Sequence, residues 1–142
     1  MVEAKDIMTT NVISVARNTP ICEAGEILLK HQNTGMPVVD DDMLLVGIIS
    51  EKDLLRLLHT YEAEQDKTVE DFMTAPAIFF QENESLEDIC DLMIANNFRR
   101  VPVTSVSRKR QVVGIVSRPD VLRYIIRTRH AETIGEQTLK LR

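Results

Sequence analysis

The feature that most constrains the fold of this chain is an internal duplication. The tetrapeptide Asp-Ile-Met-Thr at residues 6–9 recurs as Asp-Phe-Met-Thr at residues 71–74. Met-Pro-Val at residues 36–38 recurs as Val-Pro-Val at residues 101–103, at the same shift of 65 positions. Two copies of so long a period indicate one pseudo-symmetric domain rather than a solenoid of many short repeats.

A third motif closes each copy. Val-Gly-Ile-Ile-Ser at residues 46–50 recurs as Val-Gly-Ile-Val-Ser at residues 113–117, and Asp53 and Asp120 follow at the same distance. The shift is now 67 positions, so the second copy has gained two residues between its middle and last motifs. Matching Gly, Ser and Asp residues at matching spacing indicate that both copies fold in the same way.

The length of 142 residues is that of one ordinary domain. A single copy lies near the lower limit of independent stability, so we expect the two repeats to share one core. The predicted boundaries are residues 1–60 for the first repeat, 61–67 for a polar linker, 68–127 for the second repeat and 128–142 for a C-terminal tail.

The first copy has clear local signals. Apolar residues at helical spacing follow Thr19 and Pro20, which predicts a helix with a threonine cap and a proline in its first turn. Residues 36–39 read as a short strand. The continuous apolar run over residues 44–49 predicts a strand buried on both faces. Ser50 then opens a second helix.

The second copy repeats this order. A helical pattern runs through residues 86–98, strands are predicted at residues 101–104 and 111–116, and Ser117 opens the last helix. Each unit is therefore strand, helix, strand, strand, helix after a short lead-in. The expected fold class is α/β, with two pseudo-symmetric β-α-β-β-α repeats.

Charge and hydropathy narrow the function classes. The net charge of −5 disfavours nucleic-acid binding. Residues 1–66 carry 5 basic and 12 acidic residues, whereas residues 67–142 carry 12 basic and 10 acidic residues, with arginines near the second set of motifs. No apolar run approaches the roughly 20 residues of a membrane span, and the N-terminus lacks the pattern of a signal peptide. We therefore predict a cytoplasmic protein without membrane contact.

The Ser-x-x-Asp motif allows two interpretations. At the junction of a strand and a helix it is a near capping box, in which the serine caps the helix and the aspartate faces the helix dipole. The same geometry offers free N–H groups and a hydroxyl to a phosphate, and a carboxylate to a ribose diol. The two interpretations are compatible, because one side chain can cap the empty form and contact a ligand in the bound form.

The ordered motifs, found twice over residues 3–127, resemble a tandem pair of CBS domains, also called a Bateman module. The resemblance implies an α/β module with two clefts between its repeats. In this family the clefts bind adenosine derivatives such as AMP, ADP, ATP or S-adenosylmethionine, and many members bind in only one cleft. No other cofactor is implied.

The resemblance also assigns roles to residues of this chain. Asp53 and Asp120 are expected to accept hydrogen bonds from ribose hydroxyls, and Ser50 and Ser117 to donate to phosphate. The segments expected to hold adenine by apolar and backbone contacts contain Val12, Ile13, Met36, Pro37, Ala77, Ile78, Val101 and Pro102.

The two clefts are not expected to be equivalent. Arg99 and Arg100 precede Pro102 and resemble the basic signature of nucleotide sensors in this family, in which such residues reach phosphates, whereas Thr34 and Gly35 carry no charge. Arg118 lies close in sequence to the second Ser-x-x-Asp motif. We therefore expect the cleft of the second motif to bind first.

No set of residues supports catalysis, and we predict that the chain is not an enzyme. His31, His59 and His130 are scattered, without a partner at metal-ligand or triad spacing. His31 is expected to have a structural role at a helix C-terminus. The sequence predicts a non-catalytic regulatory module that binds adenine nucleotide and signals to an unknown protein partner. The alternative is a dimerisation or interaction module without ligand binding.

A homodimer is the expected assembly. The helices that end the two copies carry an apolar face, and two-fold closure is the commonest way to cover such a face. The residues predicted to form it are Leu54, Leu57, Leu58, Val121, Leu122 and Ile125.

Overall fold

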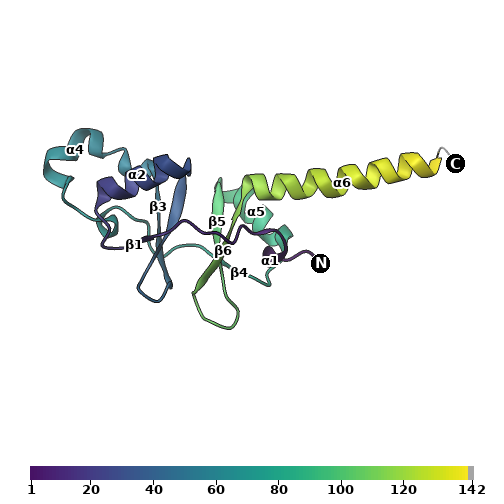
Figure 1. Cartoon of the computed structure of the whole chain (residues 1–142), viewed down its shortest axis with the longest axis horizontal. Coiled ribbons are helices and arrows are strands. Elements are labelled where there is room, and N and C mark those ends of the chain that lie inside the picture. Colours follow the sequence, from purple (N-terminus) through teal and green to yellow (C-terminus); the bar gives the residue numbers. More distant parts are fainter. Residues whose placement is uncertain (141–142) are drawn as a thin grey trace.

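The computed structural model describes residues 1–140, with the side chains described as far as Arg129. Two lobes lie side by side, and the C-terminal helix extends away from the second lobe (Figure 1). The first lobe contains β1 (Val15–Ala16), α2 (Ile21–His31), β2 (Gly35–Val39), β3 (Leu45–Ser50), α3 (Glu51–Leu54) and α4 (Leu57–Glu64).

The second lobe repeats this arrangement, and short helical segments precede each copy. The second copy contains β4 (Phe80–Gln81), α5 (Leu86–Asn96), β5 (Arg100–Thr104), β6 (Val112–Ser117) and α6 (Arg118–Lys140). The preceding segments are α1 (Ala4–Ile7) and the 3-10 turn η1 (Val69–Asp71). The α/β class and the β-α-β-β-α order predicted from the sequence are confirmed.

The sheets have the same topology in both copies. Within the described residues each sheet has three strands, in which the first strand is parallel to the second and the third is antiparallel to it. The register matches as well, because Gly35 lies opposite Ser50 and Arg100 lies opposite Ser117. This register places each Ser-x-x-Asp motif beside the start of the middle strand of its own sheet.

The lead-in segments cross between the lobes. Thr9 and Ile115 exchange backbone hydrogen bonds of 2.8 and 2.9 Å, and Thr74 and Ile48 do the same at 2.9 and 3.0 Å. Each lead-in therefore pairs with the last strand of the other copy. This crossing ties the lobes together and places residues 9–13 between them.

The repeated glycines make this crossing possible. A Cβ atom at Gly114 would collide with the side chain of Met8, and a Cβ at Gly47 would lie 2.8 Å from the sulfur of Met73. Real Cβ atoms do not come so close to a neighbour. The repeated Met and Gly residues are thus contacting partners, each glycine with the methionine of the other copy's motif.

The hydrophobic core follows the duplication. One cluster fills the first lobe around Ile21 and Ile49, and a second fills the other lobe around Ile89 and Val116. A smaller third cluster joins the sheets of both lobes through residues that include Val39, Leu45, Ala77 and Val112. The lobes are therefore packed together along a common apolar seam.

Three local expectations need correction. β3 alternates between buried and half-buried residues, so it is not buried on both faces. Its half-buried residue Ile48 pairs with Thr74, which belongs to the lead-in of the second copy. Pro20, rather than Thr19, is the N-cap of α2, and no side chain caps that helix. The helix predicted after Ser50 is divided into α3 and α4.

The segment predicted as a linker is more regular than expected, and the predicted tail takes the helical form that was one of its two expected forms. α4 continues to Glu64 and so occupies part of the predicted linker. α6 runs from Arg118 to Lys140 and includes most of the predicted tail. Within residues 1–140, no helix combines the length and the apolar character needed to cross a membrane.

Candidate functional site

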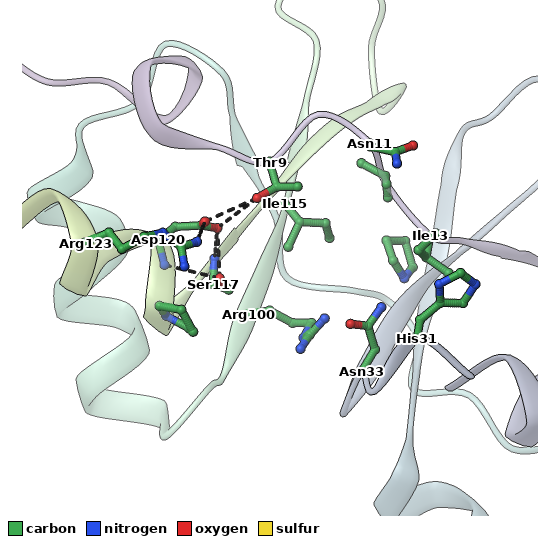
Figure 2. Close-up of a pocket in the computed structure, with 14 residues that line it drawn as sticks. Thr9, Asn11, Ile13, His31, Asn33, Arg100, Ile115, Ser117, Asp120 and Arg123 are labelled. Atoms are coloured by element: carbon green, nitrogen blue, oxygen red, sulfur yellow. Dashed lines mark hydrogen bonds and ion pairs between the residues drawn. The ribbon is translucent and has the colours of Figure 1, made fainter. Parts of the chain in front are cut away.

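A cavity of about 420 Å³ lies where the crossing segment, the start of β2 and the start of α6 meet. Figure 2 shows its polar side chains arranged around a common space. Its volume lies within the range of small-molecule binding pockets. The lining residues are Thr9, Asn11, Val12, Ile13, His31, Asn33, Gly35, Pro37, Arg100, Ile115, Ser117, Pro119, Asp120 and Arg123.

Asp120 is the most highly connected side chain in this cavity. Its carboxylate is 5% exposed and accepts hydrogen bonds from the backbone N–H of Ser117 at 2.9 Å and from the Ser117 hydroxyl at 2.8 Å. The hydroxyl of Thr9 donates at 3.2 Å, and the guanidinium of Arg123 donates at 2.7 Å. The Ser117 contacts form the capping arrangement that the motif predicts, at the point where β6 ends and α6 begins.

Arg100 brings a half-buried positive charge to the cavity. Its Nε atom is buried and has no hydrogen-bond partner among the described residues. Burial lowers the pKa of the Arg100 guanidinium, and the carboxylates of Asp120 and Glu51 act in the opposite direction. An arginine remains protonated in proteins, and a buried donor left unsatisfied is costly. The position therefore favours an anionic acceptor.

The cavity wall also contains apolar residues, and on the side away from Asp120 they are mixed with Asn11, His31 and Asn33 (Figure 2). Val12 and Ile13 come from the crossing segment, Pro37 from β2 and Ile115 from β6. Apolar walls with a few convergent polar groups are typical of sites that hold a small organic ligand. The cavity therefore combines apolar contacts, a carboxylate acceptor and a guanidinium donor.

The structure brings six of the predicted site residues together and leaves the others elsewhere. The six that line the cavity are Val12, Ile13, Pro37, Arg100, Ser117 and Asp120. Met36, beside Pro37, is buried in the core of the first lobe.

Two arginines assigned to this cleft point elsewhere. The guanidinium of Arg118 donates to the carbonyl of Phe98 at 2.9 Å and to the side-chain oxygen of Asn97 at 2.7 Å. Arg118 thereby lines a separate apolar groove between α5 and α6. Arg99 is exposed and does not line the cavity.

The remaining predicted residues are the first Ser-x-x-Asp motif and four residues of the second copy. Ser50 donates to Asp53 through its backbone N–H at 2.9 Å and its hydroxyl at 3.0 Å, repeating the capping arrangement. None of this set lines the cavity at Asp120. Of the others, Val101 and Pro102 are buried in β5, Ala77 is buried in the seam, and Ile78 is about half exposed.

Sequence reasoning missed several lining residues, of which Arg123 had a detectable signal. Asp53-Leu-Leu-Arg56 recurs as Asp120-Val-Leu-Arg123, so the last motif extends three residues further than its aspartate. His31 ends α2 as expected, but it also lines the cavity. It has no counterpart in the other copy, and neither does Asn33, so the duplication could not identify them.

The comparison with known families finds the same duplication. The family model for the CBS domain matches residues 4–60 and again residues 69–127. This chain belongs to the CBS-domain family. The two matches make it a tandem CBS pair, and the resemblance inferred from the motifs is confirmed.

Solved structures of CBS pairs are similar over almost their whole length. CBSX2 from Arabidopsis thaliana, crystallised in complex with AMP, has a TM-score of 0.80 and 31% sequence identity, covering 91% of this chain and 99% of that one. The CBS domain pair of protein MJ0100, crystallised in complex with 5′-methylthioadenosine and S-adenosyl-L-methionine, has a TM-score of 0.74 and 35% identity, covering 88% and 96%.

Some curated relatives are much longer than this chain. Protein MJ1225 of Methanocaldococcus jannaschii is 33% identical over 121 residues, which are 85% of this chain and 42% of that protein. The L-aspartate semialdehyde sulfurtransferase of the same organism is 38% identical over 119 residues, with 22% of its length covered. The chain therefore spans less than half of the length of these relatives.

Proposed function

We propose that this CBS pair is a non-catalytic regulatory module that binds an adenine nucleotide in the cavity at Asp120. The observation that carries the proposal is that the side chain of Arg100 lines the same cavity as the buried carboxylate of Asp120. A ligand that offers both hydroxyl donors and an anionic group satisfies both residues. A ribose phosphate has this combination.

The arrangement suggests an orientation for the ligand. The ribose diol donates to Asp120, the phosphate accepts from Arg100, and the adenine ring packs between Ile13 and Pro37. Charge-assisted hydrogen bonds of an arginine to phosphate are among the strongest in proteins. This orientation predicts tighter binding of AMP or ADP than of adenosine.

The relatives support the ligand class. AMP is bound by CBSX2, and 5′-methylthioadenosine and S-adenosyl-L-methionine are bound by the MJ0100 pair. All three molecules share an adenosine moiety. Within the proposed class, the positive charge of Arg100 favours an anionic nucleotide over the cationic S-adenosylmethionine.

We also propose that the module forms a homodimer and signals ligand occupancy to a protein partner. Leu58 of α4 and Ile125 of α6 occupy equivalent places in the two copies, and their side chains are 85% and 44% exposed. Leu55 and Leu122 are a second equivalent and exposed pair. Leu58, Leu122 and Ile125 belong to the apolar face expected from the sequence. The other expected members do not take part, because Leu54 and Leu57 pack against the first core and Val121 is buried.

Exposed apolar residues at matched positions suit a self-complementary contact. A ligand changes such an assembly only as far as it binds two of its states with different affinity. The cytoplasm remains the compartment predicted from the sequence.

Calorimetric titration with AMP, ADP, ATP, adenosine and S-adenosylmethionine tests the proposal. We expect saturable binding of the nucleotides, and an affinity for AMP that falls at least tenfold in Arg100→Met, which keeps an apolar stem and removes the charge. Arg99→Met is the matched control, because Arg99 is adjacent and does not line the cavity. Absence of binding by every ligand would favour the alternative of an interaction module without ligand.

A further inference from the structure

The carboxylate of Asp120 has no spare capacity for a ligand. It accepts from the Ser117 N–H, the Ser117 hydroxyl, the Thr9 hydroxyl and the Arg123 guanidinium. An ionised carboxylate offers about four lone-pair sites, so these four donors occupy it completely. A ribose diol brings two more donors and must displace two of those present.

The donors differ in how easily they can leave. The two Ser117 contacts belong to the start of α6 and are short, at 2.8 and 2.9 Å. The Thr9 hydroxyl has longer contacts, at 3.2 and 3.4 Å to the two carboxylate oxygens. Arg123 has a side chain that is 56% exposed, and it lines the cavity. Thr9 and Arg123 are therefore the donors that a diol can replace.

The two losses have different consequences. A threonine hydroxyl can rotate to another acceptor or to water. Displacement of Arg123 breaks an ion pair of 2.7 Å with a buried carboxylate, and a buried charge that loses its partner is unfavourable. The exchange becomes favourable when the incoming ligand carries its own anion for the guanidinium.

We propose that Arg123 is a specificity-determining residue that makes binding depend on an anionic group. As the ribose hydroxyls take the carboxylate of Asp120, the guanidinium of Arg123 moves to the phosphate of the same ligand. The residue thus disfavours nucleosides and favours nucleotides. This inference rests on the proposed function and adds a discrimination step to it.

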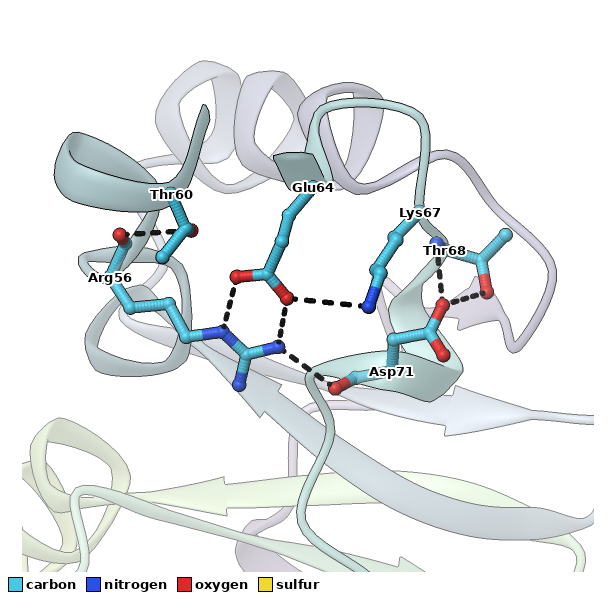
Figure 3. Close-up of polar contacts among 6 residues, drawn as sticks. All are labelled: Arg56, Thr60, Glu64, Lys67, Thr68 and Asp71. Atoms are coloured by element: carbon cyan, nitrogen blue, oxygen red, sulfur yellow. Dashed lines mark hydrogen bonds and ion pairs between the residues drawn. The ribbon is translucent and has the colours of Figure 1, made fainter. Parts of the chain in front are cut away.

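The first copy shows what happens when the equivalent arginine is already engaged. Arg56 donates to Glu64 through Nε at 3.2 Å and Nη2 at 3.0 Å, and to the carbonyl of Asp71 at 3.1 Å (Figure 3). Its guanidinium also lies 3.8 Å from the ring centre of Phe72. Arg56 is therefore held away from Asp53.

The sequence explains why Arg123 is not held in the same way. The position that corresponds to Glu64 in the second copy is Ala131. Among the side chains that the structure describes, only Ser50 donates to the carboxylate of Asp53. The exchange therefore belongs to the Asp120 cleft alone.

The test compares AMP and adenosine on the same variants of the full chain by calorimetric titration. In Arg123→Ala we expect the affinity for AMP to fall about tenfold or more, while the affinity for adenosine stays the same or rises. Arg123→Lys keeps a charge and should retain part of the preference for AMP. Arg127→Ala removes an exposed arginine one turn further along α6 and should change neither affinity.

The opposite signs for the two ligands separate this role from a structural one. If Arg123 only orients Asp120, Arg123→Ala lowers the affinities for AMP and adenosine together, and the inference is overturned. The inference is also overturned if Arg123→Lys and Arg123→Ala, both shown by circular dichroism to be folded, keep the wild-type ratio of AMP affinity to adenosine affinity. Failure of the wild-type chain to bind either ligand overturns the proposed function itself, which is a different result.

Discussion

The contact between Gly114 and Met8 gives a prediction that links the crossing segment to the ligand site. A Cβ atom at position 114 would collide with the sulfur of Met8 and lie 2.8 Å from its Cγ and 3.1 Å from the carbonyl oxygen of Thr9. The first two atoms belong to a flexible side chain, but the third belongs to the backbone. Gly114→Ala must therefore displace the lead-in segment that carries Thr9.

The magnitude follows from the cost of overpacking. One extra methyl group in a well-packed site costs roughly 1–3 kcal/mol, and each kcal/mol lowers the melting temperature of a chain of this size by about 2–4 °C. Gly114→Ala should lose this stability, and Met8→Ala in the same chain should restore part of it by removing the obstructing atoms. Urea unfolding of both single variants and of the double variant measures the coupling.

Gly47→Ala is the matched control, because its Cβ would meet Met73 at 2.8 Å and the carbonyl of Thr74 at 2.9 Å. Both variants should lose similar stability. Only Gly114→Ala should also weaken AMP binding, since the displaced segment supplies Thr9, Val12 and Ile13 to the cavity, whereas Thr74 does not line it. Wild-type stability in Gly114→Ala, or a larger loss of AMP affinity in Gly47→Ala, would refute the reasoning.

Four further outcomes are expected. Asp120→Ala should weaken AMP binding by about 1.5–3 kcal/mol, the range for hydrogen bonds to a charged group, and Asp53→Ala should weaken it less; calorimetry of both variants, with folding checked alongside, decides this. Raising the salt concentration should reduce the preference for AMP over adenosine, measured as the ratio of their dissociation constants, because screening weakens the phosphate contacts. The side chain of Thr60 and the guanidinium of Arg56 hold the pKa of Glu64 below its ordinary value of 4.5. The ionised Glu64 therefore stabilises the fold above pH 4.5, and this stabilisation is lost as the pH falls through the lower pKa of the folded state. Acid unfolding should consequently depend less on pH in Glu64→Gln. Light scattering at micromolar concentration should give a dimer for the wild-type chain and a monomer for Leu122→Glu, and a wild-type monomer with and without nucleotide would contradict the assembly.

The duplication made the topology predictable, because motifs at matched spacing imply matched strands and helices. The crossing of the lead-ins was not predictable from one copy, since the pairing of Thr9 with Ile115 joins residues more than one hundred positions apart. A continuous apolar run also gave the wrong burial for β3. Val46 and Ile48 are only partly buried against two different clusters, which the run itself does not reveal.

The site was predictable to the extent that it is repeated. Ser117 and Asp120 follow from the duplicated motif, and Arg123 was available from the same comparison. Proximity in sequence misled for Arg118, because its side chain leaves the helix start on the side of Phe98. His31 comes from the other lobe, and only the packing of the two lobes brings it to the cavity.

The most direct test of the central claim is an NMR titration of the 15N-labelled chain with AMP. Amide signals of Thr9, Ile13, Arg100, Ser117 and Asp120 should shift together and saturate at one dissociation constant, because these residues surround one cavity. Shifts that cluster instead around Ser50 and Asp53, or no saturable shift at all, would contradict the assignment of the nucleotide site to the Asp120 cleft.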